Sequence, residues 1–289
     1  MAEQPWTIGR LLDWTTQFFA AKGVEFPRLD AEVLLAHALG SSRIKLYTSF
    51  DEVASEQVRQ QFRSMVQQRV EGCPVAYLVG FKEFFSIPLQ VNRSVLIPRP
   101  DTEILVMEAL RLLKPMHQAT LLDVGTGSGA IAIALAKNHP TVQITAIDCS
   151  ADALSVARQN AKQHGVEHKV TFHISQLFNQ LPQDVVYDII VSNPPYIPTD
   201  AIAHLPAGVR DFEPHMALDG GKDGFQVITQ LISDARPFLK KGGYLLIEIG
   251  VAQEQRVREI MSQYSELSPP STIQDYSGHP RVLKTQKVM

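Results

Sequence analysis

The sequence predicts an α/β protein in which a mainly parallel sheet carries helices on both faces, preceded by a small helical domain. After Pro115, short apolar runs typical of strands alternate with longer runs of helical periodicity, and such alternation favours parallel strands joined by helices. The first 80 or so residues show helical periodicity alone. With 289 residues, the chain is long enough for both parts.

In the N-terminal 80 residues, apolar side chains recur at the three- and four-residue spacing of a helix face. The first such run begins at Ile8, the second follows Pro27, and the third covers residues 55–70. Glycines at which helices commonly end follow the three runs at Gly23, Gly40 and Gly72. Three amphipathic helices can bury one another as a small bundle, so we expect one domain over residues 1–80.

Between the two domains the sequence predicts a β-hairpin over residues 81–98. Residues 84–91 and 94–97 have the composition of strands, and Asn92 with Arg93 could form the turn between them. The run Pro98-Arg99-Pro100 excludes a helix, and Asp101 or Thr102 could then cap the next one.

The remaining chain, residues 99–289, is expected to form the sheet domain. Strands are predicted at 120–124, 143–148, 170–174, 188–192 and 244–249, with closing strands between 272 and 282. Helices are predicted at 130–138, 151–164, 225–239 and 253–262.

Composition excludes several classes of protein. The chain has 27 basic and 30 acidic residues and a net charge of −3, which disfavours binding to duplex nucleic acid through many phosphate contacts. Its two cysteines, Cys73 and Cys149, are too few for a disulfide framework or a zinc site, so we expect no metal. The first ten residues lack the apolar core of a signal peptide. We therefore expect a cytoplasmic protein.

A glycine-rich turn follows the first predicted strand of the sheet domain. Its residues are Gly125, Thr126, Gly127, Ser128 and Gly129. Glycines let the backbone approach a ligand closely, and the start of the next helix leaves amide groups unpaired. Asp148 ends the next predicted strand, where a carboxylate can accept hydrogen bonds from ribose hydroxyls. The pattern indicates a nucleotide or nucleoside site, and by itself leaves a nicotinamide-dependent dehydrogenase open.

The predicted strand 188–192 runs directly into Asn193-Pro194-Pro195-Tyr196. Ligands of doubly wound sheets bind at the carboxyl ends of the strands, so this motif should face the glycine turn. The Asn193 side-chain oxygen and the Pro194 carbonyl could accept both hydrogens of one NH2 group, and Tyr196 could stack on a planar amide or base. Two acceptors would orient the nitrogen lone pair toward a methyl donor and stabilise the positive charge that develops during transfer.

Together these features resemble the class I methyltransferases, and more narrowly the HemK/PrmC family of release factor glutamine methyltransferases. The similarity extends over nearly the whole chain. Besides the glycine turn and Asn193–Tyr196, it is carried by Pro74-Val75-Ala76-Tyr77-Leu78 with Gly80, Pro98-Arg99-Pro100-Asp101-Thr102-Glu103, and Phe212-Glu213-Pro214 with Ala217-Leu218. The resemblance implies a Rossmann-like seven-stranded sheet and methylation of the glutamine in the Gly-Gly-Gln loop of class I release factors.

The resemblance also implies roles for particular residues. S-adenosylmethionine would be held by Gly125–Gly129, Asp148, Gln176, Leu177 and Asn193, and the glutamine by Asn193, Pro194, Pro195 and Tyr196, of which Asn193, Pro194 and Tyr196 would be catalytic. The helical domain would, by this resemblance, contact the release factor. We separately expect the enzyme to act as a monomer without nucleic acid or membrane. Gln176 stands where the family usually has an acid near the adenine amino group, so we expect altered cofactor affinity.

Three other functions fit parts of the pattern. A glutamine methyltransferase of a large-subunit ribosomal protein shares Asn-Pro-Pro-Tyr but usually lacks the string that begins at Pro98. An amino methyltransferase of adenine or of an RNA base would need a basic surface and a flipped base, which the net charge of −3 disfavours. A non-catalytic cofactor-binding regulator would not need both motifs.

Overall fold

The computed structural model describes residues 5–289, which form two compact units. One unit contains residues 5–80 together with the short segment Pro206–Phe212. The other contains Phe81–Leu205 and Glu213–Met289. The segment Pro206–Phe212, with the short helix α9 (Ala207–Arg210), is thus far in sequence from the residues with which it is grouped.

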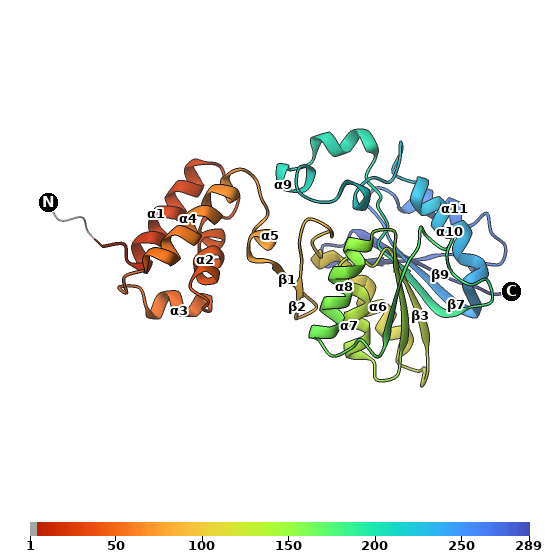
Figure 1. Ribbon diagram of the computed structural model, residues 1–289. Helices are drawn as coiled ribbons and strands as arrows, with labels where there is room; N and C mark the ends of the chain where they lie inside the picture. The colour runs from red at the N-terminus through yellow and green to blue at the C-terminus, as the bar shows by residue number, and fades with distance from the viewer. Residues whose placement is uncertain (1–4) are drawn as a thin grey trace. The chain divides into compact units, whose positions relative to one another are not determined.

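The first unit is helical, as the sequence predicts (Figure 1). The three predicted helices are present as α1 (Ile8–Ala21), α2 (Pro27–Ala38) and α4 (Glu56–Val70), and two short helices were not predicted, α3 (Arg43–Thr48) and α5 (Val75–Val79). Hydroxyls define two of the starts, because Thr7 Oγ1 accepts from Arg10 N at 3.2 Å and Ser55 Oγ from Val58 N at 3.3 Å.

This helical unit has its own hydrophobic core, which includes the fully buried side chains Leu12, Phe19, Leu34, Leu35 and Leu46. Two buried carboxylates lie beside it and are paired. Asp30 accepts from Arg69 Nε at 2.7 Å, and Glu32 forms ion pairs with Arg28 and Arg43. The pairs satisfy charges that would otherwise be costly to bury.

The second unit begins with the hairpin of β1 (Phe81–Phe84) and β2 (Ile87–Gln90). Its turn lies at Phe85 and Ser86, which both have positive φ, so the predicted turn at Asn92 and Arg93 is wrong. Residues 94–97, predicted as extended, are not in a strand. Asn92 instead accepts a hydrogen bond from Ser94 N at 2.9 Å, a local Asx turn that ends the extended segment.

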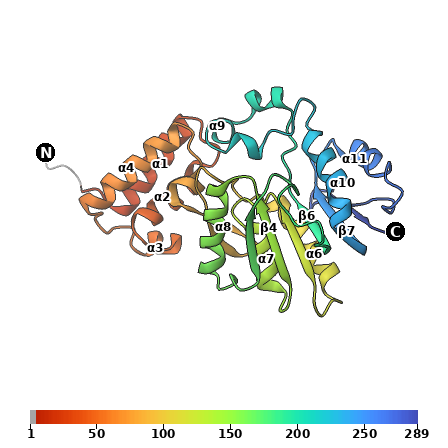
Figure 2. The same cartoon turned by 45° about the vertical axis from the view of Figure 1, so that its right-hand side comes forward.

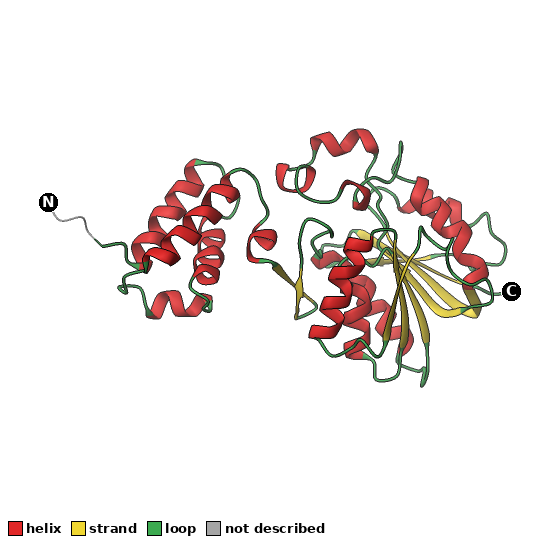
Figure 3. Ribbon diagram, viewed as in Figure 1, coloured by secondary structure: helices red, strands yellow, loops and turns green. Residues whose placement is uncertain are grey.

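The sheet of the second unit has seven strands in the order β5-β4-β3-β6-β7-β9-β8 (yellow in Figure 3). The first five are parallel, whereas β9 is antiparallel to both β7 and β8. Their bounds are β3 (Thr120–Val124), β4 (Gln143–Asp148), β5 (Val170–Ile174), β6 (Tyr187–Ser192), β7 (Leu239–Glu248), β8 (Ser271–Gln274) and β9 (Pro280–Gln286). The predicted sheet, including its closing strands, is confirmed.

Helices cover both faces of this sheet (Figures 1 and 2). On one face lie α6 (Glu103–Leu113), α7 (Ala130–Asn138) and α8 (Ala151–Gln163), and on the other α10 (Gln226–Phe238) and α11 (Glu254–Met261). Successive strand residues serve opposite cores: Leu121 packs under α6 and α7, whereas Leu122 packs under α10. No helix within residues 5–289 combines the length and apolarity needed to cross a membrane.

Because β3, β4, β6 and β7 are parallel neighbours, their carboxyl ends meet at one edge of the sheet. The glycine turn follows β3, Asp148 ends β4, Asn193 follows β6 and Glu248 ends β7. The topology therefore brings both sequence motifs to the same edge, together with an acid that the sequence did not single out.

Candidate active site

The glycine turn after β3 is built from left-handed backbone. Gly125, Gly127 and Gly129 have φ values of 74°, 56° and 82°, which favour glycine. A Cβ added to Gly125 or Gly127 would meet nothing within 4 Å, so these two glycines border open space. A Cβ on Gly129 would instead lie 2.9 Å from Ile133 Cδ1. The first two glycines thus leave room for a ligand, and the third allows close packing of α7.

Asp148 is held directly beside this turn. Its Oδ2 accepts a hydrogen bond from Gly127 N at 2.9 Å, and its Oδ1 accepts from Ser150 N at 2.9 Å. Ionised carboxylate oxygens have further lone pairs, so each can accept another hydrogen bond. The structure therefore brings Asp148 and the glycine turn together, and the carboxylate keeps acceptor capacity for a ligand.

A buried acid, Asp123, lies beneath the turn and was not predicted as a site residue. Its Oδ2 accepts from Thr126 Oγ1 at 2.7 Å and from Ala132 N at 3.2 Å. Its Oδ1 is buried and accepts no hydrogen bond from residues 5–289. Burial raises the pKa of Asp123 to about 7, and the negative charge of Asp148 adds to this effect. The sequence feature that could have singled out Asp123 is its position as an acid inside an otherwise apolar strand.

Gln176 and Leu177 follow β5, the strand next to β4. Ser175 N donates to Asp148 O at 2.9 Å, which brings the start of this loop to the end of β4. Leu177 has a positive φ of 50°, and Gln176 N donates to Gln180 Oε1 at 2.8 Å. The Gln176 side chain is exposed. Its role toward a cofactor stays a prediction.

The Asn193–Tyr196 motif lies at the end of β6, next to the glycine turn. Ser192 Oγ donates to Val124 O at 2.8 Å and so joins the two strand ends from which the motifs start. Asn193 Nδ2 donates to Thr102 Oγ1 at 3.1 Å. No donor in residues 5–289 reaches Asn193 Oδ1 or the Pro194 carbonyl oxygen. Both acceptors that the sequence singled out are thus available to a ligand.

The backbone of Tyr196 is held by Gln253 and by the loop of residues 220–224, neither of which was predicted from the sequence to contact the motif. Gln253 Nε2 donates to Tyr196 O at 3.0 Å and to Gly224 O at 3.2 Å. A Cβ on Gly220 would lie 2.8 Å from Tyr196 Cα, and one on Gly224 only 2.5 Å from Tyr196 O. Residues 220–224 therefore pack on the motif through glycine, with no space for a side chain.

Glu248 at the end of β7 and Arg281 on β9 interact electrostatically with each other and with Tyr196 of the motif. Glu248 is 1% exposed, and burial raises its pKa to about 7 against the opposing effects of Thr102 and Arg281. Arg281 Nη2 pairs with Asp101 at 3.0 Å and with Asp275 at 3.3 Å. Burial also raises the pKa of Tyr196 to about 12, and the charge of Glu248 contributes. Thr102 makes no cap hydrogen bond to α6, so the predicted capping by its side chain is wrong.

Two further pieces of the resemblance meet in an ion pair. Arg99 Nη2 lies 2.6 Å from Glu213 Oε1, and Glu213 Oε2 accepts from Ile97 N at 3.4 Å. Burial raises the pKa of Glu213, although the charge of Arg99 opposes this. The pair fixes the Pro98–Pro100 segment to the chain that follows residue 212.

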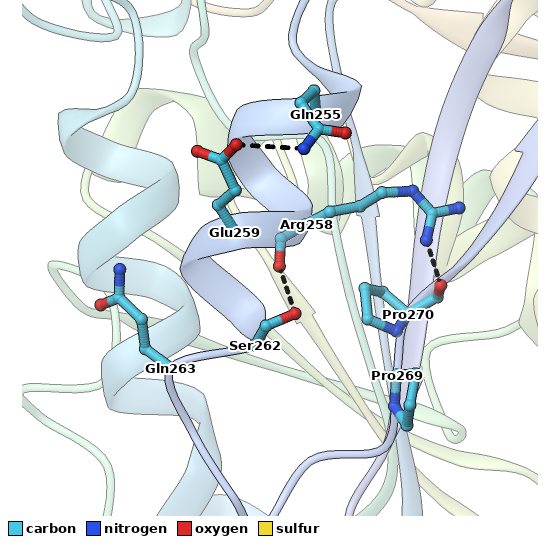
Figure 4. A pocket seen from close by; sticks show the side chains of 7 residues that line it. All are labelled: Gln255, Arg258, Glu259, Ser262, Gln263, Pro269 and Pro270. Carbon is cyan, nitrogen blue, oxygen red and sulfur yellow. Dashed lines mark hydrogen bonds between the residues drawn. The ribbon is translucent and has the colours of Figure 1, made fainter.

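Two pockets on the sheet unit lie away from the glycine turn and the Asn193–Tyr196 motif. One lies between α11 and the segment before β8, where Arg258 Nη1 donates to Pro270 O at 2.5 Å (Figure 4). Another lies between α10 and α11 and is bordered by Asp223 and Tyr264. Neither contains a residue of the glycine turn or of Asn193–Tyr196. Within residues 5–289, no three potential metal-ligating side chains converge.

Comparison with known proteins identifies both units. Residues 10–80 match the family model described as the PrmC N-terminal domain, and residues 116–286 match one described as a methyltransferase domain. A solved methyltransferase from Pyrococcus furiosus has the same fold, with a TM-score of 0.52 and 17% sequence identity, covering 78% of this chain and 98% of that one.

Full-length relatives share one name, release factor glutamine methyltransferase. The protein of this name from Rhodopirellula baltica is 47% identical, covering 99% of this chain and 98% of its own. Those from Geobacter sulfurreducens and Aliivibrio fischeri are 42% and 38% identical, each covering 98% of both chains. The resemblance stated from the motifs is confirmed, and the chain belongs to the release factor glutamine methyltransferase family.

Proposed function

We propose that this chain transfers a methyl group from S-adenosylmethionine to the side-chain amide nitrogen of the glutamine in the Gly-Gly-Gln loop of class I peptide-chain release factors. The observation that carries the proposal is the pair of free acceptors, Asn193 Oδ1 and the Pro194 carbonyl, beside the glycine turn. The names of the full-length relatives favour a release factor over a ribosomal protein or a nucleic-acid base.

The residues around the glycine turn suit the cofactor. Gly125 and Gly127 border open space, and the Asp148 carboxylate is held where it can accept hydrogen bonds from the ribose hydroxyls. Gln176 and Leu177 line the part of the site that would hold the adenine of the cofactor. Asn193 borders the part that would hold its methionine. When bound, S-adenosylmethionine supplies a methyl group on a positively charged sulfur, and it leaves as neutral S-adenosylhomocysteine.

The residues after β6 suit the glutamine. Asn193 Oδ1 and the Pro194 carbonyl accept the two amide hydrogens, while Pro195 keeps the backbone rigid and Tyr196 offers a flat ring to the amide plane. Held in this way, the nitrogen lone pair points at the methyl group, and the acceptors stabilise the positive charge that develops on the nitrogen. Once the methyl group is attached, this nitrogen loses one proton to water, which leaves the neutral methylated amide.

The proposal assigns a role to each part of the chain. Residues 1–80 recognise the release factor, residues 81–98 link the domains, and residues 99–289 carry out methyl transfer. The enzyme works as a monomer in the cytoplasm and needs neither nucleic acid nor a membrane, which fits its net charge of −3.

The test is methyl transfer from labelled S-adenosylmethionine to a purified class I release factor. One control is a release factor whose loop glutamine is alanine, and the other is the enzyme variant Asn193→Ala. We expect label only on the intact factor and a loss of at least about a hundredfold in rate with Asn193→Ala, as for other groups that stabilise transition-state charge.

Other outcomes would change the assignment. Label on a ribosomal protein or a nucleic acid, with none on the factor, would keep a methyltransferase but remove this substrate. Equal label on the alanine factor would move the reaction away from the loop glutamine. Cofactor binding without transfer to any acceptor would favour a regulator over an enzyme.

A further inference from the structure

Asn193 can present either end of its side-chain amide to a substrate, and the two ends have opposite chemistry. The Oδ1 end accepts hydrogen bonds and suits the NH2 group of glutamine, whereas the Nδ2 end donates them and suits a carboxylate. A rotation of 180° about the last side-chain bond exchanges the two ends. The proposed function therefore requires something in the protein that fixes the amide.

Thr102 contacts the Nδ2 end. The distance from Asn193 Nδ2 to Thr102 Oγ1 is 3.1 Å, so the threonine hydroxyl acts as the acceptor in this contact. Thr102 is 5% exposed and makes no cap hydrogen bond to α6, although it stands at the start of that helix. Its hydroxyl is thus directed to the active site.

Glu248 determines the direction of the hydroxyl. The Thr102 hydroxyl lies near enough to the Glu248 carboxyl group, which is 1% exposed at the end of β7, to lower the pKa of Glu248 as a hydrogen-bond donor. At pH 8, above its raised pKa of about 7, Glu248 is mainly an ionised carboxylate that can only accept, so the Thr102 hydrogen is committed to Glu248. The remaining lone pairs of Thr102 Oγ1 can then only accept, and they select the Nδ2 end of Asn193.

We propose, building on the proposed function, that Thr102 and Glu248 are positioning residues that hold the Asn193 amide with Oδ1 toward the substrate. They select glutamine over glutamate in the release factor loop. Neither residue touches the reacting atoms; they act through Asn193.

The charged surroundings support this chain of hydrogen bonds. Groups that interact with Glu248 come from Arg281 on β9, from Arg99 and Asp101 before α6, and from Tyr196 after β6. The two arginines favour the carboxylate and Asp101 opposes it. One oxygen, Glu248 Oε2, has no hydrogen-bond partner in residues 5–289. Removal of the Thr102 hydroxyl would therefore leave Glu248 less completely paired and Asn193 Nδ2 without its acceptor.

The test compares the affinities of two release factors, one with its natural loop glutamine and one with Gln→Glu in the loop. Both are measured by calorimetry with S-adenosylhomocysteine at pH 8. For the wild type we expect a clear preference for glutamine. In Thr102→Val this preference should fall about tenfold, the equivalent of one hydrogen bond to a charged or buried partner. Thr102→Ser, which keeps the hydroxyl, should restore it.

A control variant separates positioning from packing. Thr285 is another buried threonine of the same unit, and its Oγ1 donates to Ser268 O at 2.7 Å, away from the motif. Thr285→Val should leave the ratio of the two affinities unchanged, even if it weakens both. An equal loss of both affinities in Thr102→Val, with an unchanged ratio, would overturn the inference and leave the proposed function intact.

A second measurement does not depend on the release factor. In protein labelled with 15N-asparagine, the side-chain signal of Asn193 can be assigned from its absence in Asn193→Ala. We expect its amide hydrogens to exchange slowly in the wild type and in Thr102→Ser, and faster in Thr102→Val and Glu248→Gln. An unchanged exchange rate in both of the latter variants would contradict the inference, whatever the enzyme methylates.

Discussion

At the residue scale, the site contains buried acids whose ionisation makes the stability of the folded protein depend on pH. Asp123 is fully buried under the glycine turn, and its pKa is raised from 3.8 to about 7, chiefly by burial. Between these two values the folded protein keeps the proton that the unfolded chain releases. The free energy of unfolding should therefore decrease as pH rises from about 4 to about 7, by at most roughly 1.4 kcal/mol per pH unit for this residue.

Replacement of Asp123 isolates this contribution. Asp123→Asn keeps an oxygen for Thr126 Oγ1 and Ala132 N but cannot ionise. Compared with the wild type, its stability should improve between pH 5 and pH 7.5, because acids that do not interact with Asp123, such as Glu248, contribute equally to both proteins. Urea unfolding at the two pH values measures this difference. A stability difference between the two proteins that is independent of pH would show that Asp123 titrates normally.

The residues proposed to contact a ligand could be predicted from the sequence, whereas those proposed to support them could not. Asp148 and Asn193 stand in motifs whose spacing is set by a strand and a turn, so their places follow from local sequence. Thr102 and Glu248 belong to segments 91 and 55 residues away from Asn193, and only the tertiary fold brings these segments to the same edge of the sheet. No local pattern marks Glu248, and the string that begins at Pro98 contains Thr102 without showing its contact with Asn193. Thr102 looks like a helix cap, and Glu248 ends an ordinary apolar strand.

At the element scale, the long helices and buried strands were predictable because the helices repeat apolar residues every three or four positions and the strands are short apolar runs. The hairpin turn was not, because its residues are atypical. Phe85 and Ser86 occupy left-handed conformations that favour Asn or Gly, and the Asn92-Arg93 pair looked like the better turn. A tertiary contact helps to determine the outcome: Phe85 N donates to Glu103 Oε1 at 2.9 Å, across a distance that local sequence does not encode.

The loop of residues 220–224 offers a prediction at this scale. Gly224 has a φ of 79°, and a Cβ there would lie 2.5 Å from Tyr196 O. Gly224→Ala should therefore displace the Asn193–Tyr196 segment. We expect a loss of stability of about 2–4 kcal/mol, from left-handed strain and from the contact, and a large loss of methyl transfer. Urea unfolding and the labelled transfer assay measure the two effects.

Gly242 provides the matched control. Its φ is 81°, nearly the same, but the nearest atom to an added Cβ is 4.0 Å away. Gly242→Ala should thus lose only about 1–2 kcal/mol through backbone strain and keep its methyl transfer. If the two variants lost equal activity, general destabilisation would account for the effect and the contact with Tyr196 would not.

At the scale of the whole molecule, the chain has two kinds of core. The helical unit has one core, which includes Leu34 and Leu35. The sheet unit has a separate core on each face of its sheet. Separate cores allow separate unfolding, so a single free energy of unfolding need not describe the protein. A ligand that binds at the glycine turn should stabilise only the unit that contains this turn.

Hydrogen exchange read by mass spectrometry tests this independence. Leu34→Ala should cost about 2–5 kcal/mol and reduce amide protection in residues 5–80, whereas the matched Leu245→Ala should reduce it in the sheet. S-adenosylhomocysteine at a hundred times its dissociation constant should add up to about 2.7 kcal/mol of protection to the sheet unit. Peptides that cover Pro206–Phe212 should follow residues 5–80, because they belong to that unit. If Leu34→Ala reduced protection of the sheet just as strongly, the two units would unfold as one, and binding at the glycine turn would stabilise the entire chain.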